Sequence, residues 1–168
     1  MFIMHKAAIA AAALGMSAMP AAAQAPAGST YVAKAGASDL YEKTSSEIVL
    51  QSTQDPKVRE FAQGMIRDHS KSTADIKAAA AQHKLKVPPP KLTAEQARMV
   101  AQLRAAKGTQ RDTLYWQQQK TAHQQALALH QSYAEGGEKP SLKTVASNVV
   151  PVVQHHLEML NGNANHSM

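Results

Sequence analysis

The chain has 168 residues, no cysteine and a formal net charge of +6 at pH 7. The lack of cysteine excludes disulfides, thiolate-bound zinc and iron–sulfur clusters, so a metal would have to be held by histidine, carboxylate or water. The basic residues are interleaved with acids and carry no aromatic stacking motif, which argues against nucleic acid as a partner and fits either weak attraction to anionic envelope surfaces or solubility alone.

The first 25 residues predict an export signal rather than part of the fold. His5 and Lys6 give a weakly basic start, a short apolar run follows, and Ala23 to Ala25 supply a small-x-small cleavage site. The apolar run is shorter than the ~20 residues that a membrane-spanning helix needs, and no later segment is long and apolar enough. We therefore expect a soluble, exported, periplasmic chain that starts near Pro26.

Helical periodicity begins soon after this segment. Residues 31–52 favour a first helix. Asp55 and Pro56 are typical of an N-cap followed by a first turn, and the apolar residues after them recur at three- and four-residue steps. The second helix is expected to run to about Lys84, before the proline run at 88–90 stops it.

Three further helices follow. Thr93 and Gln96 form a capping-box pattern that opens a shorter helix, which Gly108 closes. Residues 110–135 favour a long helix, and Ser141 is expected to cap a last helix that runs through Leu160.

This order of elements predicts an all-α protein, because no alternating strand pattern is present. Short connections within the first and last pairs of long helices favour antiparallel neighbours, and so a ferritin-like, up-and-down four-helix bundle with one short extra helix between helices two and three. The expected boundaries are a signal peptide at 1–25, a linker at 26–30, the bundle at 31–162 and a flexible tail at 163–168.

Three histidines are expected to share one layer of that bundle. In an up-and-down bundle, the turn near Gln54 and the turn near Gly137 lie at the same end. At ~1.5 Å per residue, His69, His123 and His156 then lie about 20, 18 and 21 Å from that end. His69 and His156 replace apolar residues in their helical stripes, and His123 lies on the flank of its stripe. On the first helix the same height falls near Asp39 to Glu42.

Two interpretations of this layer remain open. Three imidazoles with a nearby carboxylate suit zinc, copper or iron, and sites inside bundles are built by such inward projection. Alternatively, the histidines form a buried polar network in which His69 is braced by Asp68 or by a tyrosine. The candidate outer partners are Asp68, Tyr115 and Gln119, and Asp68 points about 100° away from His69 around the helix.

Signatures of catalysis are missing from the sequence. It contains no nucleophile–base constellation, phosphate-binding glycine loop or HExxH motif. The paired Glu and Glu-x-x-His pattern of di-iron bundles is also missing. These observations favour a protein that is not an enzyme, since an oxidoreductase or a hydrolase would need an open coordination position and a cleft.

Three stretches carry a family resemblance: YEKTSSEIVLQSTQDPKVREFAQGMIRDHSKS, YWQQQKTAHQQALALHQSYAEGG and LKTVASNVVPVVQHHLEML. In order, they resemble the exported bacterial family catalogued as domain of unknown function 4142. The resemblance implies a ferritin-like fold, export, and a recurring set that matches Asp68, His69, His123 and His156. It implies no activity.

Two functional hypotheses follow. The first is a non-enzymatic periplasmic bundle that serves metal handling or envelope stress through the buried histidines. The second is a structural or partner-binding bundle whose histidines form a polar network without metal. The sequence does not indicate which protein partner such a bundle would bind.

Overall fold

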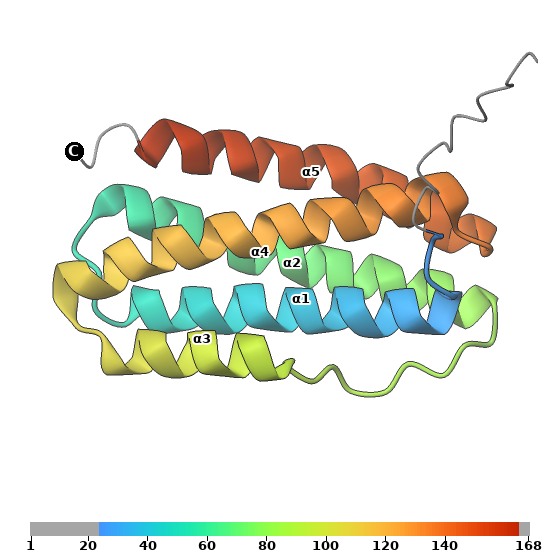
Figure 1. Cartoon of the computed structure of the whole chain (residues 1–168), viewed down its shortest axis with the longest axis horizontal. Helices are drawn as coiled ribbons and strands as arrows, with labels where there is room; N and C mark the ends of the chain where they lie inside the picture. Colours follow the sequence, from blue (N-terminus) through green and yellow to red (C-terminus); the bar gives the residue numbers. More distant parts are fainter. Residues whose placement is uncertain (1–23, 165–168) are drawn as a thin grey trace, which may run out of the picture.

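The computed structural model describes residues 24–164, and all regular secondary structure within them is helical (Figure 1). The helices are α1 (Gly28–Leu50), α2 (Pro56–Gln82), α3 (Ala94–Ala105), α4 (Gly108–Gly136) and α5 (Pro140–Ala164). The prediction of an all-α helical bundle is confirmed for this part of the chain. No helix in it is long and apolar enough to cross a membrane. The expected signal peptide, up to residue 23, and residues 165–168 of the expected tail lie outside the described residues.

The predicted starts of α2 and α3 are confirmed at the level of individual hydrogen bonds. The Asp55 side chain accepts a hydrogen bond from the Lys57 backbone N–H at 2.8 Å, and Pro56 occupies the first turn. Thr93 and Gln96 form both bonds of a capping box, at 3.2 and 2.9 Å. These local signals were sufficient because capping depends only on neighbouring residues.

Tertiary contacts move the ends of two other helices. Helix α1 starts three residues before the expected position, where the Gly28 N–H donates to the Glu138 side chain at 3.2 Å. A Cβ at Gly28 would lie 3.0 Å from Lys139 Cγ, so a larger residue would have to push that side chain aside. Helix α5 starts at Pro140, so Ser141 is not its cap. The Ser141 hydroxyl lies instead 2.7 Å from Nε2 of His83, the residue that follows α2.

The order of the long helices differs from the prediction. Gly28 contacts the α4–α5 turn, whereas Arg111 near the start of α4 donates to Ser52 in the α1–α2 turn at 2.8 Å. The two short turns therefore lie at opposite ends, and α2 and α4 run in the same direction (Figure 1). The expectation of a simple up-and-down order with both turns at one end was wrong. Residues 83–93 and α3 carry the chain back along the bundle before α4 begins.

Four long helices surround the core. Helix α1 packs against α2 and α4, α5 packs against the same two helices, and α3 lies outside against α1 and α4. Apolar residues form two clusters, one toward each end. The cluster toward the α1–α2 turn includes Tyr41, Val49, Phe61, Met65 and Leu103. The cluster toward the α4–α5 turn includes Tyr31, Val32, Ile76, Tyr133 and Leu142. Between them lies a buried polar layer that contains Asp39, Glu42, His69, Gln119, His123 and His156.

Candidate functional site

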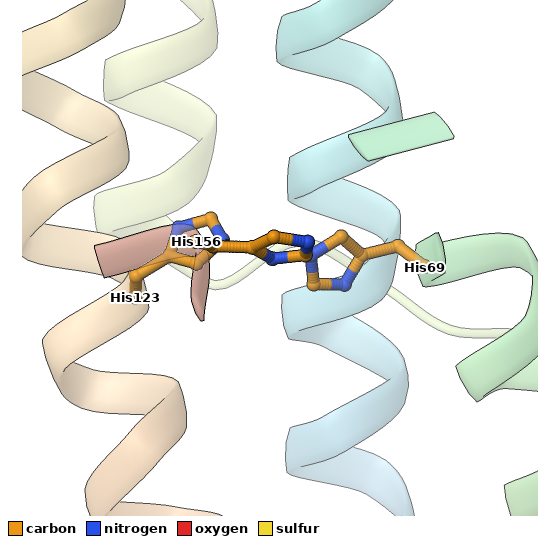
Figure 2. A group of neighbouring side chains, drawn as sticks. All are labelled: His69, His123 and His156. Carbon is orange, nitrogen blue, oxygen red and sulfur yellow. The ribbon is translucent and has the colours of Figure 1, made fainter. Parts of the chain in front are cut away.

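The three predicted histidines meet in this polar layer. His69 on α2, His123 on α4 and His156 on α5 point toward one another (Figure 2). Their ring centroids lie 5.2 to 5.8 Å apart, and one nitrogen from each ring lies within 4.8 Å of the other two. The residues are 5, 0 and 3% exposed, in chain order. The three rings therefore form one compact, buried triangle, which we call the histidine cluster.

The histidines meet although the turns lie at opposite ends. Each of the three sits near the middle of a helix that spans the bundle. A residue at mid-height keeps its height when the direction of its helix is reversed. The three histidines therefore share one layer even though the predicted order of the helices was wrong.

Each histidine has a hydrogen-bond partner on its outer side, away from the centre of the cluster. His69 Nδ1 lies 2.8 Å from Asp39 Oδ1 on α1. His123 Nδ1 lies 2.9 Å from the backbone oxygen of Gln119, one turn earlier on α4. His156 Nε2 lies 3.1 Å from Asp68 Oδ2 on α2. Such partners fix the orientation and tautomer of a histidine, as the outer partners of metal-bound histidines do.

Two of the three candidate outer partners contact the histidine cluster. Asp68 contacts the cluster through His156 and not through its neighbour His69, because adjacent helical residues point in different directions. Gln119 contributes its backbone oxygen, while its side-chain amide donates to Ser45 at 3.0 Å. Tyr115 shares a 2.8 Å hydrogen bond with Ser46 on α1 and so is not the brace of a histidine.

The sequence interpretation offered Asp68 or a tyrosine as the brace of His69, but the structure shows another partner. That partner is Asp39, which is 2% exposed and also accepts a hydrogen bond from Thr73 at 2.9 Å. The helical rise had already placed residues 39–42 at the height of the cluster. An acid at that height, on the apolar side of α1, was the signal that could have found it.

No proton is left for a hydrogen bond between His123 and His156 on the inner side of the cluster. A neutral histidine carries a single N–H, and in His123 and His156 the outer contacts with Gln119 and Asp68 use it. The inner nitrogens, His123 Nε2 and His156 Nδ1, then face each other as two lone pairs 3.2 Å apart. His69 Nε2 is buried without a hydrogen-bond partner in the described residues. Three lone pairs therefore converge when every outer contact is satisfied by a neutral ring.

Electrostatics keep two of these rings neutral. Burial lowers the pKa of His123 well below its ordinary value, and the neighbouring His69 and His156 lower it further. Burial also lowers the pKa of His156 to about 4, against the opposing hydrogen bond to Asp68. For His69, burial acts in the same direction, but the hydrogen bond to Asp39 and nearby acids outweigh it and raise the pKa. A proton and a metal ion would therefore compete most strongly at His69.

A further acid lies beside the cluster. Glu42 on α1 is 0% exposed, and its Oε1 lies 3.5 Å from His123 Nδ1 on the outer side of that ring. Burial raises the pKa of Glu42 to about 7, against the lowering effects of His69 and Gln119. Neither carboxyl oxygen accepts a hydrogen bond from the described residues. The position suits a protonated acid better than a fourth metal ligand.

The fold and the histidine cluster together define a class: helical bundles that bury a polar, histidine-containing layer between two apolar clusters. The family model described as domain of unknown function (DUF4142) matches residues 13–162, and the chain belongs to that family. This confirms the resemblance found in the sequence. No curated protein matched the chain in a sequence search.

Two crystal structures have a similar fold. A DUF305 fragment from Deinococcus radiodurans is 17% identical, with a TM-score of 0.72, and the match covers 85% of this chain and 98% of that one. A DUF305 protein from Streptomyces coelicolor, described as a candidate secreted protein, is 16% identical. Its TM-score is 0.67, over 80% of this chain and 88% of that one. At these identities the likeness shows the fold alone.

Proposed function

We propose that this chain is an exported helical-bundle protein that binds one first-row transition-metal ion through His69, His123 and His156. The observation that carries the proposal is the convergence of three inner nitrogens whose outer partners already use the N–H of each neutral ring. A metal ion bound at these nitrogens would take the three lone pairs and leave every outer hydrogen bond in place.

The donor set indicates which ions fit. Neutral imidazole nitrogens suit zinc, copper and iron, whereas magnesium and calcium prefer oxygen ligands. Zinc–nitrogen bonds of ~2.0–2.1 Å in a tetrahedral site place two nitrogens about 3.3–3.4 Å apart. The 3.2 Å between His123 Nε2 and His156 Nδ1 is close to this spacing. The full set spans up to 4.8 Å, so binding would draw the rings closer together.

Export is part of the proposal. Its supports are the basic start, apolar run and small-x-small site of residues 1–25, together with the description of the Streptomyces coelicolor protein as a candidate secreted protein. Cleavage near Pro26 would leave α1 intact, because that helix begins at Gly28. A periplasmic location would place the histidine cluster where it meets metal ions that enter from outside.

We also propose that the bundle is ferritin-like in its connections. Ferritin-like bundles have one long crossover between their second and third long helices. Here residues 83–93 and α3 make that crossover between α2 and α4. The di-iron ligand pattern of ferritins is not present in this sequence, so the likeness concerns architecture and carries no iron-storage role.

A second candidate is the structural bundle without metal. It is favoured by the contact between His69 and Asp39, because the raised pKa of His69 suits an imidazolium paired with a carboxylate. That pair does not supply the proton that is missing between His123 and His156, which is why we rank the metal-binding proposal first.

Melting of the chelator-treated protein with and without added metal separates these two candidates. A ligand that binds only the native state at about 100 times its Kd adds ~2.7 kcal/mol to the free energy of unfolding. We expect Zn²⁺, Cu²⁺ or Fe²⁺ to raise the Tm by roughly 5–15 °C, and Mg²⁺, which prefers oxygen ligands, to leave it unchanged. Equal Tm values with all four ions would support the structural bundle.

The outer contact of His69 gives a further prediction. Replacing Asp39 with asparagine keeps the shape of the side chain but removes its charge, and outer partners of this kind typically contribute about 10–100-fold in metal affinity. We expect Asp39→Asn to weaken zinc binding by that factor in a competition titration with a chelator. Glu60→Gln, an exposed acid on α2, is the control and should bind as the wild type does. Equal affinities of the two variants would argue against a role for Asp39.

A further inference from the structure

A small pocket leads from the surface to the histidine cluster. It has a volume of about 150 Å³, lies between α2 and α5, and includes His69 and His156 in its lining. Asp68, Lys71 and Asp75 stand at its rim, with side chains that are 43, 75 and 44% exposed. The pocket therefore brings solvent-accessible space next to two of the three histidines.

Two buried polar groups beside this pocket lack partners. Ser72, one turn after His69 on α2, is 7% exposed, and its hydroxyl has no hydrogen-bond partner in the described residues. The same is true of His69 Nε2. Both residues line the pocket. Buried polar groups are nearly always satisfied. A metal ion at the histidine cluster would satisfy His69 Nε2, so the Ser72 hydroxyl is the group that indicates a further ligand.

We propose that this pocket holds an open fourth coordination position of the metal centre and that a small anion binds there. The inference rests on the proposed function, because three histidines leave a tetrahedral ion with one free position, as in zinc sites that bind water or substrate. The Ser72 hydroxyl would donate a hydrogen bond to the bound anion.

Charge and size define the ligand class. With a divalent ion in place, the ion and Lys71 outweigh Asp68 and Asp75 among the pocket-lining groups, so an anion is attracted. Without the ion, the two acids outweigh the lysine and repel an anion. The pocket volume and a wall formed by Val149, Val152 and Val153 restrict the ligand to a few non-hydrogen atoms.

Azide is the probe, and cobalt is the reporter ion. The full chain is loaded with Co²⁺, its cobalt content is measured, and azide is then titrated while the visible absorption of cobalt is recorded. We expect a saturable change with one azide per cobalt. Azide should not bind to the metal-free protein, because its pocket has a net negative lining.

Two pairs of variants locate the binding. Val152, which is 40% exposed, stands in the pocket, whereas Gln154 is exposed on α5 outside it. Val152→Trp should weaken azide binding at least about tenfold by filling the pocket, and Gln154→Trp should not. Ser72→Ala should weaken azide binding about tenfold through the lost hydrogen bond. Ser70→Ala, an exposed serine on the same helix, should not.

The outcomes separate this inference from the proposed function. If cobalt binds but its spectrum does not change on addition of azide, the open coordination position is refuted and the metal centre is not. Equal azide affinity in Val152→Trp and Gln154→Trp, at full cobalt content, would also overturn it. A protein that takes up no cobalt at its histidine cluster would remove the metal centre and this inference with it.

Discussion

Replacing His156 with alanine is expected to lower the affinity for zinc by more than about 100-fold. The change removes Nδ1, one of the three inner nitrogens, and so costs more than the ~10–100-fold that an outer partner typically contributes. The measurement is a competition titration of zinc between the protein and a chelator of known affinity. The same loss is expected for His69→Ala, because its ring points toward the other two (Figure 2) and its Nε2 has no hydrogen-bond partner in the described residues.

The chain offers a matched control for this variant. His155 is the adjacent residue on α5, but its side chain is 68% exposed and it pairs with Glu158 instead of the cluster. His155→Ala should bind zinc as the wild type does. Melting of both variants in chelator shows whether His156→Ala has kept its fold. A folded His156→Ala protein with unchanged zinc affinity would refute the ligand set.

Replacing Glu42 with glutamine is expected to stabilise the metal-free protein above neutral pH. Burial raises the pKa of Glu42 from 4.5 to about 7, so the folded state retains a proton that the unfolded chain releases. The stability that this proton gives is complete below pH 4.5 and is lost as the pH rises through 7. Glutamine resembles the protonated acid at every pH. At pH 8 the variant should therefore exceed the wild type by roughly 3 kcal/mol in the free energy of unfolding.

Urea unfolding at several pH values tests this expectation. The difference between Glu42→Gln and the wild type should be near zero at pH 4.5 and should reach its full size above pH 7. Glu47→Gln, an exposed acid on the same helix, should show no such trend. A Glu42→Gln variant that is less stable than the wild type at pH 8 would mean that Glu42 is ionised and paired with His69.

Much of the fold could be predicted because its signals are local. The caps at Asp55 and Thr93 depend on residues within one turn, and both helix starts were correct. The direction of α4 was not local information. It depends on whether residues 83–93 and α3 carry the chain back to the other end of the bundle. Their length allows this, but the sequence pattern does not require it. The early start of α1 likewise depends on Glu138, more than one hundred residues away.

The site could be predicted in its centre but not in its surroundings. Helical rise and stripe position brought the three histidines to one layer, and their place near mid-helix made that result independent of helix direction. The partners depend on which helix faces which. Asp68 therefore contacts His156 across the α2–α5 interface, and Asp39 reaches His69 from α1. The residue pattern of one helix does not indicate which residues of another helix it contacts.

X-ray absorption of the zinc-loaded protein tests the central claim most directly, because it reports the atoms bound to the ion. With one zinc per chain, the account predicts a first shell that contains three imidazole nitrogens at about 2.0–2.1 Å. The same spectrum from the His69→Ala, His156→Ala double variant should show no such shell. A first shell made only of oxygens, or a wild-type protein that retains no zinc after dialysis, would contradict the account.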